Sequence, residues 1–275
     1  MKTLILLAIL LVLVSCPGPL FAQAAAGSVS GINFGSNEKT GRFIRIRGMD
    51  MYCEVYGTGT PVLLIHGNGG SIASMRSQAP FFLKHHRVIA ADSRSQGRSK
   101  DGADSLSYEM MADDYGALLD SLHAGPAFVI GWSDGGIIGL LLAIRHPGKV
   151  RKLAATGANI RPDSSAVPFS DIQSMISQVE QLKLAPSDAT TKNVIKLTRL
   201  MIDQPYISHA ALQTIHCPVL VIGGDHDIIK PEHTLEIFRS IPGAKLWILP
   251  GSGHDTCIKF KDDFNEQVER FFREK

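Results

Sequence analysis

The segment Gly131-Trp-Ser-Asp-Gly-Gly136 contains the residues best suited to chemistry in this chain. It joins an apolar run at 127–130 to a second apolar run at 137–144, which we interpret as a strand followed by a helix. In that context, Gly-x-Ser-x-Gly places a serine hydroxyl on a strained turn above the end of a sheet. The flanking glycines allow the strand and the helix to approach closely. We therefore predict that Ser133 is a nucleophile.

A serine nucleophile needs a base, because its hydroxyl is unreactive at neutral pH. His254 lies in a glycine-rich loop between the last predicted strand and the C-terminal helix, so it should project over the same sheet edge as Ser133. The orienting acid should follow the strand predicted at 219–222, where Asp225 and Asp227 both occur. We prefer Asp227 and keep Asp225 as the alternative. A carboxylate here would fix the tautomer of His254 and stabilise its imidazolium.

The loop at residues 66–70, which follows an apolar strand at 61–65, predicts an oxyanion hole. Its expected donors are the backbone N–H groups of Asn68 and of Asp134, the residue after the nucleophile. A nucleotide-binding loop is the rival interpretation. It fails because Ile72 interrupts Gly-x-Gly-x-x-Gly and because the chain contains no Gly-Lys-Ser/Thr sequence.

The elements that must position these residues alternate along the chain, which indicates an α/β fold with a mainly parallel sheet covered on both faces. The first two strands have the pattern of an exposed antiparallel hairpin at the sheet edge. The expected strands are 43–47, 51–55, 61–66, 87–92, 127–131, 150–155, 219–222 and 246–249. The expected helices are 73–82, 108–122, 137–144, 172–184, 194–202 and 260–272.

Residues 161–211 contain no clear strand, only polar helical patterns. One interpretation is a pair of ordinary connecting helices. Connections without an insertion are much shorter, however, and insertions at the C-terminal edge of a parallel sheet more often cover the site there. We therefore expect a small helical cap over about 161–211, whose exposed side chains would select the substrate.

The remaining histidines and the cysteines suggest no metal site, disulfide or cofactor site. His85 and His86 precede a strand, at the wrong end of the sheet, and His146 ends a helix, where it would complement the helix dipole. His226 and His233 lack the spacing of metal ligands. Cys217 and Cys257 are expected at opposite ends of the sheet, beyond disulfide reach, so no bridge is predicted.

The N-terminus predicts an export signal over residues 1–24. Lys2 precedes an apolar stretch at 4–14 that is too short to span a bilayer comfortably, and small residues for cleavage follow. The sequence ending in Cys16 also resembles a bacterial lipobox, which would lipidate that cysteine and anchor the product to a membrane. Either outcome predicts a periplasmic or extracellular protein, with an N-terminal arm at 25–41 and one catalytic domain at 42–275.

The composition of the chain restricts the classes of molecule that it is expected to bind. The 275 residues carry a net charge of +2, which gives no electrostatic case for binding nucleic acid or an acidic membrane surface. The chain is long enough for one large domain with a sizeable core. A small molecule is therefore the expected partner, and the oligomeric state is left open.

Five motifs in order make residues 42–275 similar to the α/β-hydrolase superfamily. Besides the serine segment, Asp227 and His254, they are His66-Gly67 and the segment 92–99, where Ser95 replaces the glycine usual in the family. The serine segment looks like that of the esterase and valacyclovir-hydrolase-like branch. The resemblance implies an α/β-hydrolase fold, hydrolysis of a small ester or related acyl substrate through an acyl-serine, and no cofactor. Lactonases, amidases, carbon–carbon bond hydrolases and perhydrolases remain open.

A function of another class is a ligand receptor on the same scaffold, with single or no turnover. Fold alone does not separate a receptor from an enzyme. The complete set of Ser133, Asp227 and His254 favours the enzyme.

Overall fold

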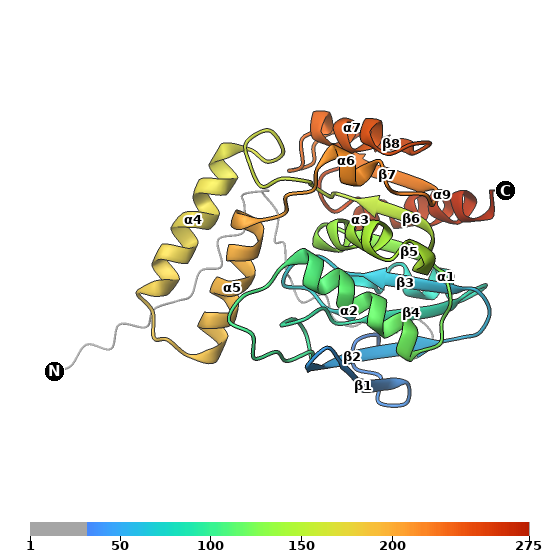
Figure 1. The fold of residues 1–275 in the computed structure, drawn as a ribbon, viewed down its shortest axis with the longest axis horizontal. Helices are drawn as coiled ribbons and strands as arrows, with labels where there is room; N and C mark the ends of the chain where they lie inside the picture. The colour runs from blue at the N-terminus through green and yellow to red at the C-terminus, as the bar shows by residue number, and fades with distance from the viewer. Residues whose placement is uncertain (1–31, 275) are drawn as a thin grey trace.

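The computed structural model describes residues 32–274, so the predicted signal, Cys16 and the first part of the arm lie outside the described residues. One eight-stranded sheet runs through the molecule in the order β1-β2-β4-β3-β5-β6-β7-β8 (Figure 1). The strands are β1 (Gly41–Ile46), β2 (Met49–Tyr56), β3 (Pro61–Ile65), β4 (Arg87–Ala91), β5 (Ala127–Trp132), β6 (Val150–Thr156), β7 (Val219–Gly224) and β8 (Lys245–Leu249).

Pairing within the sheet follows the predicted plan. Strands β3 to β8 are mutually parallel, whereas β1 pairs antiparallel with β2, and β2 pairs antiparallel with β4. The carboxyl ends of all the parallel strands therefore meet at one edge of the sheet. The loops after β3, β5, β7 and β8 carry the predicted site residues to this edge.

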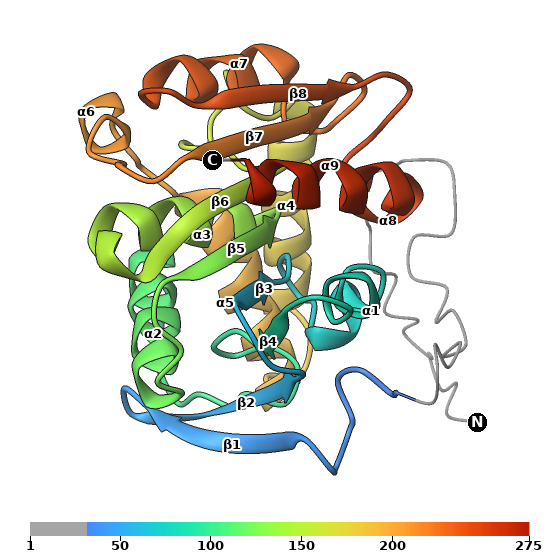
Figure 2. The same ribbon diagram turned by 90° about the vertical axis from the view of Figure 1, so that its right-hand side faces the viewer.

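Helices cover both faces of the sheet, as predicted. On one face, α2 (Tyr108–Ser121), α3 (Asp134–Arg145), α6 (His209–Leu212) and α7 (Pro231–Ser240) pack with the sheet into one apolar core. On the other face, the turn η1 (Ile72–Met75) and the helices α1 (Ala79–Phe82), α8 (Thr256–Lys259) and α9 (Lys261–Arg273) form a second core, rich in phenylalanine (Figure 2). The 3-10 turn η2 (Pro147–Lys149) links α3 to β6. Between residues 32 and 274, no helix has the length and apolar character needed to span a membrane.

Two expectations were wrong. The predicted helix at 73–82 is instead the turn η1 and the four-residue helix α1. Pro80 lies in the first turn of α1, where its missing N–H costs nothing, but it would break a longer helix passing through that position. The hairpin was expected to be exposed on both strands, yet most of β2 is buried. Its Met51 and Cys53 contribute to one core, and its Tyr52 and Tyr56 contribute to the other.

Two helices within the predicted cap, α4 (Phe169–Lys183) and α5 (Ala189–Asp203), pack against each other beyond one end of the sheet (Figure 1). The segment 161–211 that contains them enters from β6 and returns through α6 to β7. Helix α4 is largely exposed, and only its Val179 is buried. Helix α5 buries Leu197, Thr198 and Leu200, so it is the member of the pair that faces the main domain.

Close backbone packing joins α3 to the sheet. A Cβ atom added at Gly135 would lie 2.1 Å from the carbonyl oxygen of Ile65 in β3, and one added at Gly131 would lie 2.1 Å from the carbonyl oxygen of Gly135. Only glycine fits such contacts, because real Cβ atoms do not approach backbone this closely. Gly131 and Gly135 of the serine segment are therefore required by the crossing of β3, β5 and α3.

We expect Gly135→Ala to destabilise the fold by about 3 kcal/mol or more, because the new methyl group meets rigid backbone. Gly139→Ala in the same helix is the matched control. Its methyl group would lie 2.7 Å from Cδ1 of Leu153, a side-chain end that can move, and alanine also improves helix propensity by roughly 1 kcal/mol. Urea unfolding of both variants measures the difference. Equal stabilities would contradict the backbone contact.

Candidate active site

Ser133 lies on the turn between β5 and α3 in a strained conformation. Its φ of 57° and ψ of −121° are rare for a residue with a side chain. The Ser133 N–H donates to the Thr156 carbonyl at the end of β6 (2.9 Å), which anchors the turn to the neighbouring strand. The strain is thus maintained by the sheet and helix on either side, and the hydroxyl is held above the sheet edge.

His254 and Asp227 complete a chain of short contacts with Ser133. Nε2 of His254 lies 2.8 Å from Oγ of Ser133, and Nδ1 of His254 lies 2.7 Å from Oδ1 of Asp227. The Asp227 side chain is only 1% exposed. Asp225, the alternative acid, is exposed and instead contacts the ring of His226. The structure therefore brings Ser133, His254 and Asp227 together and leaves Asp225 outside.

The environment of His254 favours its charged form. Burial alone would lower the pKa of His254, but the Asp227 carboxylate, helped by the charges of Asp134 and Asp255, more than compensates, so the pKa is raised above the ordinary 6.5. An imidazole with a raised pKa is a strong acceptor for the Ser133 proton. Protonation of the ring is stabilised by the charge of Asp227 at the opposite nitrogen.

Two residues missed by the sequence analysis hold His254 in place. Nε1 of Trp132 donates to the His254 carbonyl (2.8 Å), so the residue before Ser133 also fixes the histidine loop. Gly157 follows β6 with a φ of +62°, and a Cβ atom there would lie 2.9 Å from Cε1 of His254. Neither role has a sequence signature, because the contacts join loops far apart in the chain.

The expected oxyanion loop faces Ser133. A Cβ atom at Gly67 would lie 3.1 Å from Cβ of Ser133, so the loop backbone passes directly beside the nucleophile. Within residues 32–274, no hydrogen bond from the N–H of Asn68 or of Asp134 is found. Asp134 is the first residue of α3, where N–H groups have no partner inside the helix. These two N–H groups are therefore available to a ligand.

His66 is a structural residue of this loop. Nδ1 of His66 contacts the Gly67 carbonyl (2.7 Å), and Nε2 accepts the N–H of Ser93 (2.9 Å), so the ring joins the loops after β3 and β4. Burial lowers the pKa of His66 to about 4. The ring is consequently neutral, with its proton on Nδ1, throughout the neutral pH range.

The carboxylate of Asp134 is buried beside the nucleophile. Its Oδ2 accepts from Nδ2 of Asn68 (2.8 Å) and its Oδ1 accepts from the Tyr108 hydroxyl (2.9 Å). Burial raises the pKa of Asp134 to about 6, although both hydrogen bonds and the charge of His254 oppose the increase. Asp134 was expected to contribute only its backbone N–H, and Tyr108 had no expected role in the site.

Helix α5 contacts the loops of the sheet edge through polar groups. The Leu197 carbonyl accepts from Nδ2 of Asn68 (3.3 Å). Asn193 donates to the Ser95 carbonyl (2.8 Å), and Lys196 donates to the Ala103 carbonyl (2.7 Å). The segment 161–211 is thus in direct contact with the loop at 66–70 next to Ser133.

Ser95, which stands where the resembled family usually has glycine, adopts a φ of 63°. This left-handed conformation explains the usual glycine, because side chains are disfavoured there. The Ser95 hydroxyl contacts Asp101 (3.3 Å), a local hydrogen bond that offsets part of the strain. The replacement leaves Ser133 and His254 unaffected.

Three other histidines make structural contacts. His86 pairs with Glu269, His146 contacts Asp113 at the end of α3, and His233 accepts the N–H of Ile160. No metal-binding cluster of His, Cys, Asp or Glu occurs in the described part of the chain. The cysteines described, all of them free, are Cys53, Cys217 and Cys257.

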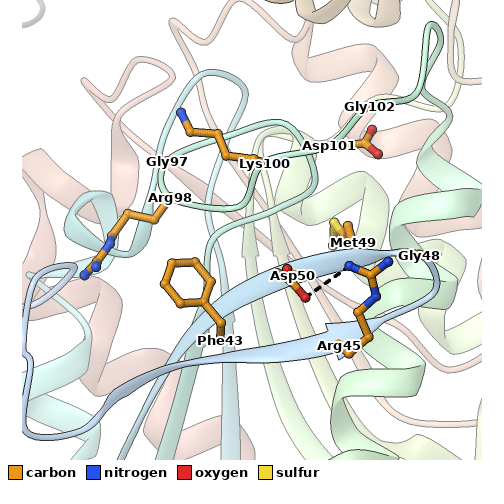
Figure 3. A pocket seen from close by; sticks show the side chains of 10 residues that line it. All are labelled: Phe43, Arg45, Gly48, Met49, Asp50, Gly97, Arg98, Lys100, Asp101 and Gly102. Atoms are coloured by element: carbon orange, nitrogen blue, oxygen red, sulfur yellow. Dashed lines mark hydrogen bonds and ion pairs between the residues drawn. The ribbon is translucent and has the colours of Figure 1, made fainter.

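A groove of about 860 Å³ opens between the β1–β2 hairpin and the loop at 97–102 (Figure 3). Phe43, Arg98 and Lys100 line it, and Arg45 in its floor pairs with Asp50. None of Ser133, Asp227 and His254 lines this groove. It is therefore separate from the candidate active site.

Comparison with known proteins gives matches over most of the chain. A family model for the alpha/beta hydrolase fold matches residues 60–201. The chain is 35% identical to 2-hydroxymuconate semialdehyde hydrolase of Pseudomonas sp. (strain CF600), over 87% of this chain and 96% of that protein. It is 26% identical to a serine hydrolase of Homo sapiens, over 68% of this chain and 69% of that protein.

Two solved structures have the same fold. An esterase from Exiguobacterium antarcticum matches with a TM-score of 0.73 at 23% identity, covering 85% of this chain and all (100%) of that one. The enol-lactonase from Burkholderia xenovorans LB400 matches with a TM-score of 0.69 at 21% identity, again covering 85% and 100%. At these identities the likeness concerns architecture alone.

The raised pKa of Asp134 predicts a pH-dependent stability. The unfolded carboxyl titrates near 3.8 and the folded one near 6, so the folded state binds more protons in between and stability falls as pH rises through this window. Relative to Asp134→Asn, the wild type should gain up to about 3 kcal/mol between pH 7 and pH 4.

Asp113→Asn is the control for this prediction. Arg145 lowers the pKa of Asp113 to about 2, so its contribution changes only below pH 4. Denaturant unfolding at several pH values measures both differences. A constant difference between wild type and Asp134→Asn from pH 4 to pH 7 would contradict the raised pKa.

Proposed function

The chain belongs to the α/β-hydrolase superfamily, and from that premise we propose that it is a serine hydrolase of carboxylesterase type, cleaving a small ester or related acyl substrate. The observation that carries the proposal is the continuous contact from Oγ of Ser133 through His254 to Asp227, with distances of 2.8 and 2.7 Å. This geometry suits proton transfer from the hydroxyl to the imidazole.

In the proposed mechanism, His254 takes the Ser133 proton while Oγ attacks the carbonyl carbon. The oxyanion that forms accepts hydrogen bonds from the N–H groups of Asn68 and Asp134. His254 then gives its proton to the leaving alcohol, which departs and leaves an acyl-serine. Water enters, gives a proton to His254 and attacks the acyl carbon. The second tetrahedral intermediate then collapses to the acid, and His254 returns the proton to Oγ, which restores Ser133. Asp227 orients and stabilises the imidazolium in both halves.

Substrate choice is proposed to rest with the segment 161–211, because α5 contacts the loop beside Ser133. The similar proteins include an esterase, an enol-lactonase and a 2-hydroxymuconate semialdehyde hydrolase, so proteins of this fold act on different substrates. Hydrolysis of a carbon–carbon bond is the second candidate, and the 35% identity to the Pseudomonas hydrolase favours it.

We also propose that the protein is exported to the periplasm or the extracellular space, because its N-terminal sequence resembles an export signal.

Turnover of short-chain p-nitrophenyl esters tests the reaction class. Wild type should release p-nitrophenol over many turnovers, and Ser133→Ala should lose at least about 10³-fold in rate, because the nucleophile is absent. Ser121→Ala, which removes an exposed helix hydroxyl bonded to the Ala117 carbonyl, should behave as wild type. Release of only one equivalent of p-nitrophenol would favour a single-turnover receptor.

Assays with lactones, amides and a vinylogous diketone as further substrates distinguish ester hydrolysis from hydrolysis of a carbon–carbon bond.

The pH dependence of kcat/KM tests the base. The rate should rise with pH and reach half its plateau above pH 6.5, because only neutral His254 accepts the serine proton and its pKa is raised. Asp227→Asn should move that midpoint to lower pH and reduce the plateau by on the order of 10²–10⁴. Asp225→Asn is the matched control and should change neither. A rate that is flat from pH 5 to pH 8 would exclude His254 as the base.

A further inference from the structure

The two residues proposed to supply the oxyanion donors are joined by their own side chains. Nδ2 of Asn68 donates to Oδ2 of Asp134 across 2.8 Å, although the residues are 66 positions apart in the sequence. The bridge connects the loop after β3 to the first turn of α3. The backbone N–H groups that would bind the oxyanion belong to the same two residues.

The loop holds the Asn68 backbone mainly on one side. The Gly67 carbonyl, which shares a peptide unit with the Asn68 N–H, contacts Nδ1 of His66 (2.7 Å) and accepts the Gly70 N–H (3.1 Å). On the other side, Gly69 has a φ of +66°, and a Cβ atom there would meet nothing within 4 Å. Glycine has wide conformational freedom, so the Asn68 side chain is the contact that ties this residue to Asp134 at the start of α3.

The second hydrogen of the Asn68 amide reaches the Leu197 carbonyl of α5 (3.3 Å). Asp134 is held in turn by the hydroxyl of Tyr108, and the Tyr108 N–H donates to Gln204, the residue that ends α5 (3.3 Å). Both ends of the bridge are therefore connected to the same helix of the segment 161–211.

We propose that Asn68 is a positioning residue whose side-chain amide sets the spacing of the Asn68 and Asp134 N–H donors and makes that spacing depend on the docking of α5. The inference rests on the proposed function. A primary amide suits the position because one nitrogen donates to a carboxylate and to a carbonyl at once. With α5 in contact with Asn68, as in this structure, the bridge holds both donors in place.

Variants that exchange the amide and the carboxylate test the bridge. Asn68→Asp faces one carboxylate with another and loses the bond. Asp134→Asn keeps an amide oxygen that accepts from Asn68 while its NH₂ group faces the Tyr108 oxygen, so this single variant retains the bond. In Asn68→Asp/Asp134→Asn the new amide donates to the new carboxylate and still accepts from Tyr108. The bridge is then restored with the polarity reversed, whereas the bond to the Leu197 carbonyl is not.

Two measurements are made on each variant, namely kcat/KM for p-nitrophenyl acetate and inhibition by an alkyl trifluoromethyl ketone. Oγ of Ser133 adds to the ketone carbon and the serine proton passes to His254, which leaves an alkoxide at the oxyanion position. We expect Asn68→Ala and Asn68→Asp to lose about 10- to 100-fold in kcat/KM and to weaken the ketone by the same factor. The double exchange should recover to within about fivefold of wild type.

Asn193→Ala is the matched control, because it removes another amide bond between α5 and a loop of the same edge but leaves the bridge intact. It should lose less activity than Asn68→Ala or Asn68→Asp, because it weakens the docking of α5 at one point without breaking the bridge. Asn68→Ala or Asn68→Asp as active as Asn193→Ala, or a folded double exchange no better than Asn68→Asp, would overturn the inference. If the double exchange does not fold, Asn68→Ala against Asn193→Ala decides. A wild type without ester turnover or ketone binding would instead contradict the proposed function, and the inference with it.

Discussion

The close crossing of α3 over β3 is the constraint on which the site depends. Gly135 touches the backbone of Ile65, so the N-terminus of the helix and the end of the strand share one small volume. The strained Ser133 is held at this crossing, and the loop at 66–70 must emerge beside it. Any residue with a side chain at Gly135 would separate the nucleophile from the N–H groups proposed to serve it.

The sequence predicted those structural features that depend on residues close together in the chain. The serine turn and the strands of the parallel sheet have short apolar and glycine patterns that specify them without knowledge of the rest of the chain. The choice between Asp225 and Asp227 was open in sequence terms, since both follow β7 within three residues of its end. The turn after the strand resolves it, because it directs Asp225 to solvent and Asp227 toward the His254 ring.

Contacts between loops far apart in the chain could not be predicted from the sequence. Trp132, Tyr108 and Gly157 have ordinary local settings, and their roles arise only where the folded chain places them against His254 or Asp134. The prediction of one helix over 73–82 was wrong because apolar spacing indicated a continuous helix, whereas Pro80 allows only the short helix α1 to begin there. Burial of β2 was missed because residues 32–40 and the segment after β4 cover it from elsewhere in the chain. Glu54 shows this, since it accepts the N–H groups of Gly35 and Asn37 inside the fold.

Two histidines at this sheet edge are driven in opposite directions by their surroundings. His66, enclosed without a charged partner, has its pKa lowered to about 4, while His254, beside Asp227, has its pKa raised above 6.5. In the pH range in which the His254 ring changes charge, the His66 ring stays neutral. The contacts that His66 makes with the loop therefore do not change when His254 gains or loses its proton, and of these two rings only His254 changes charge near neutral pH.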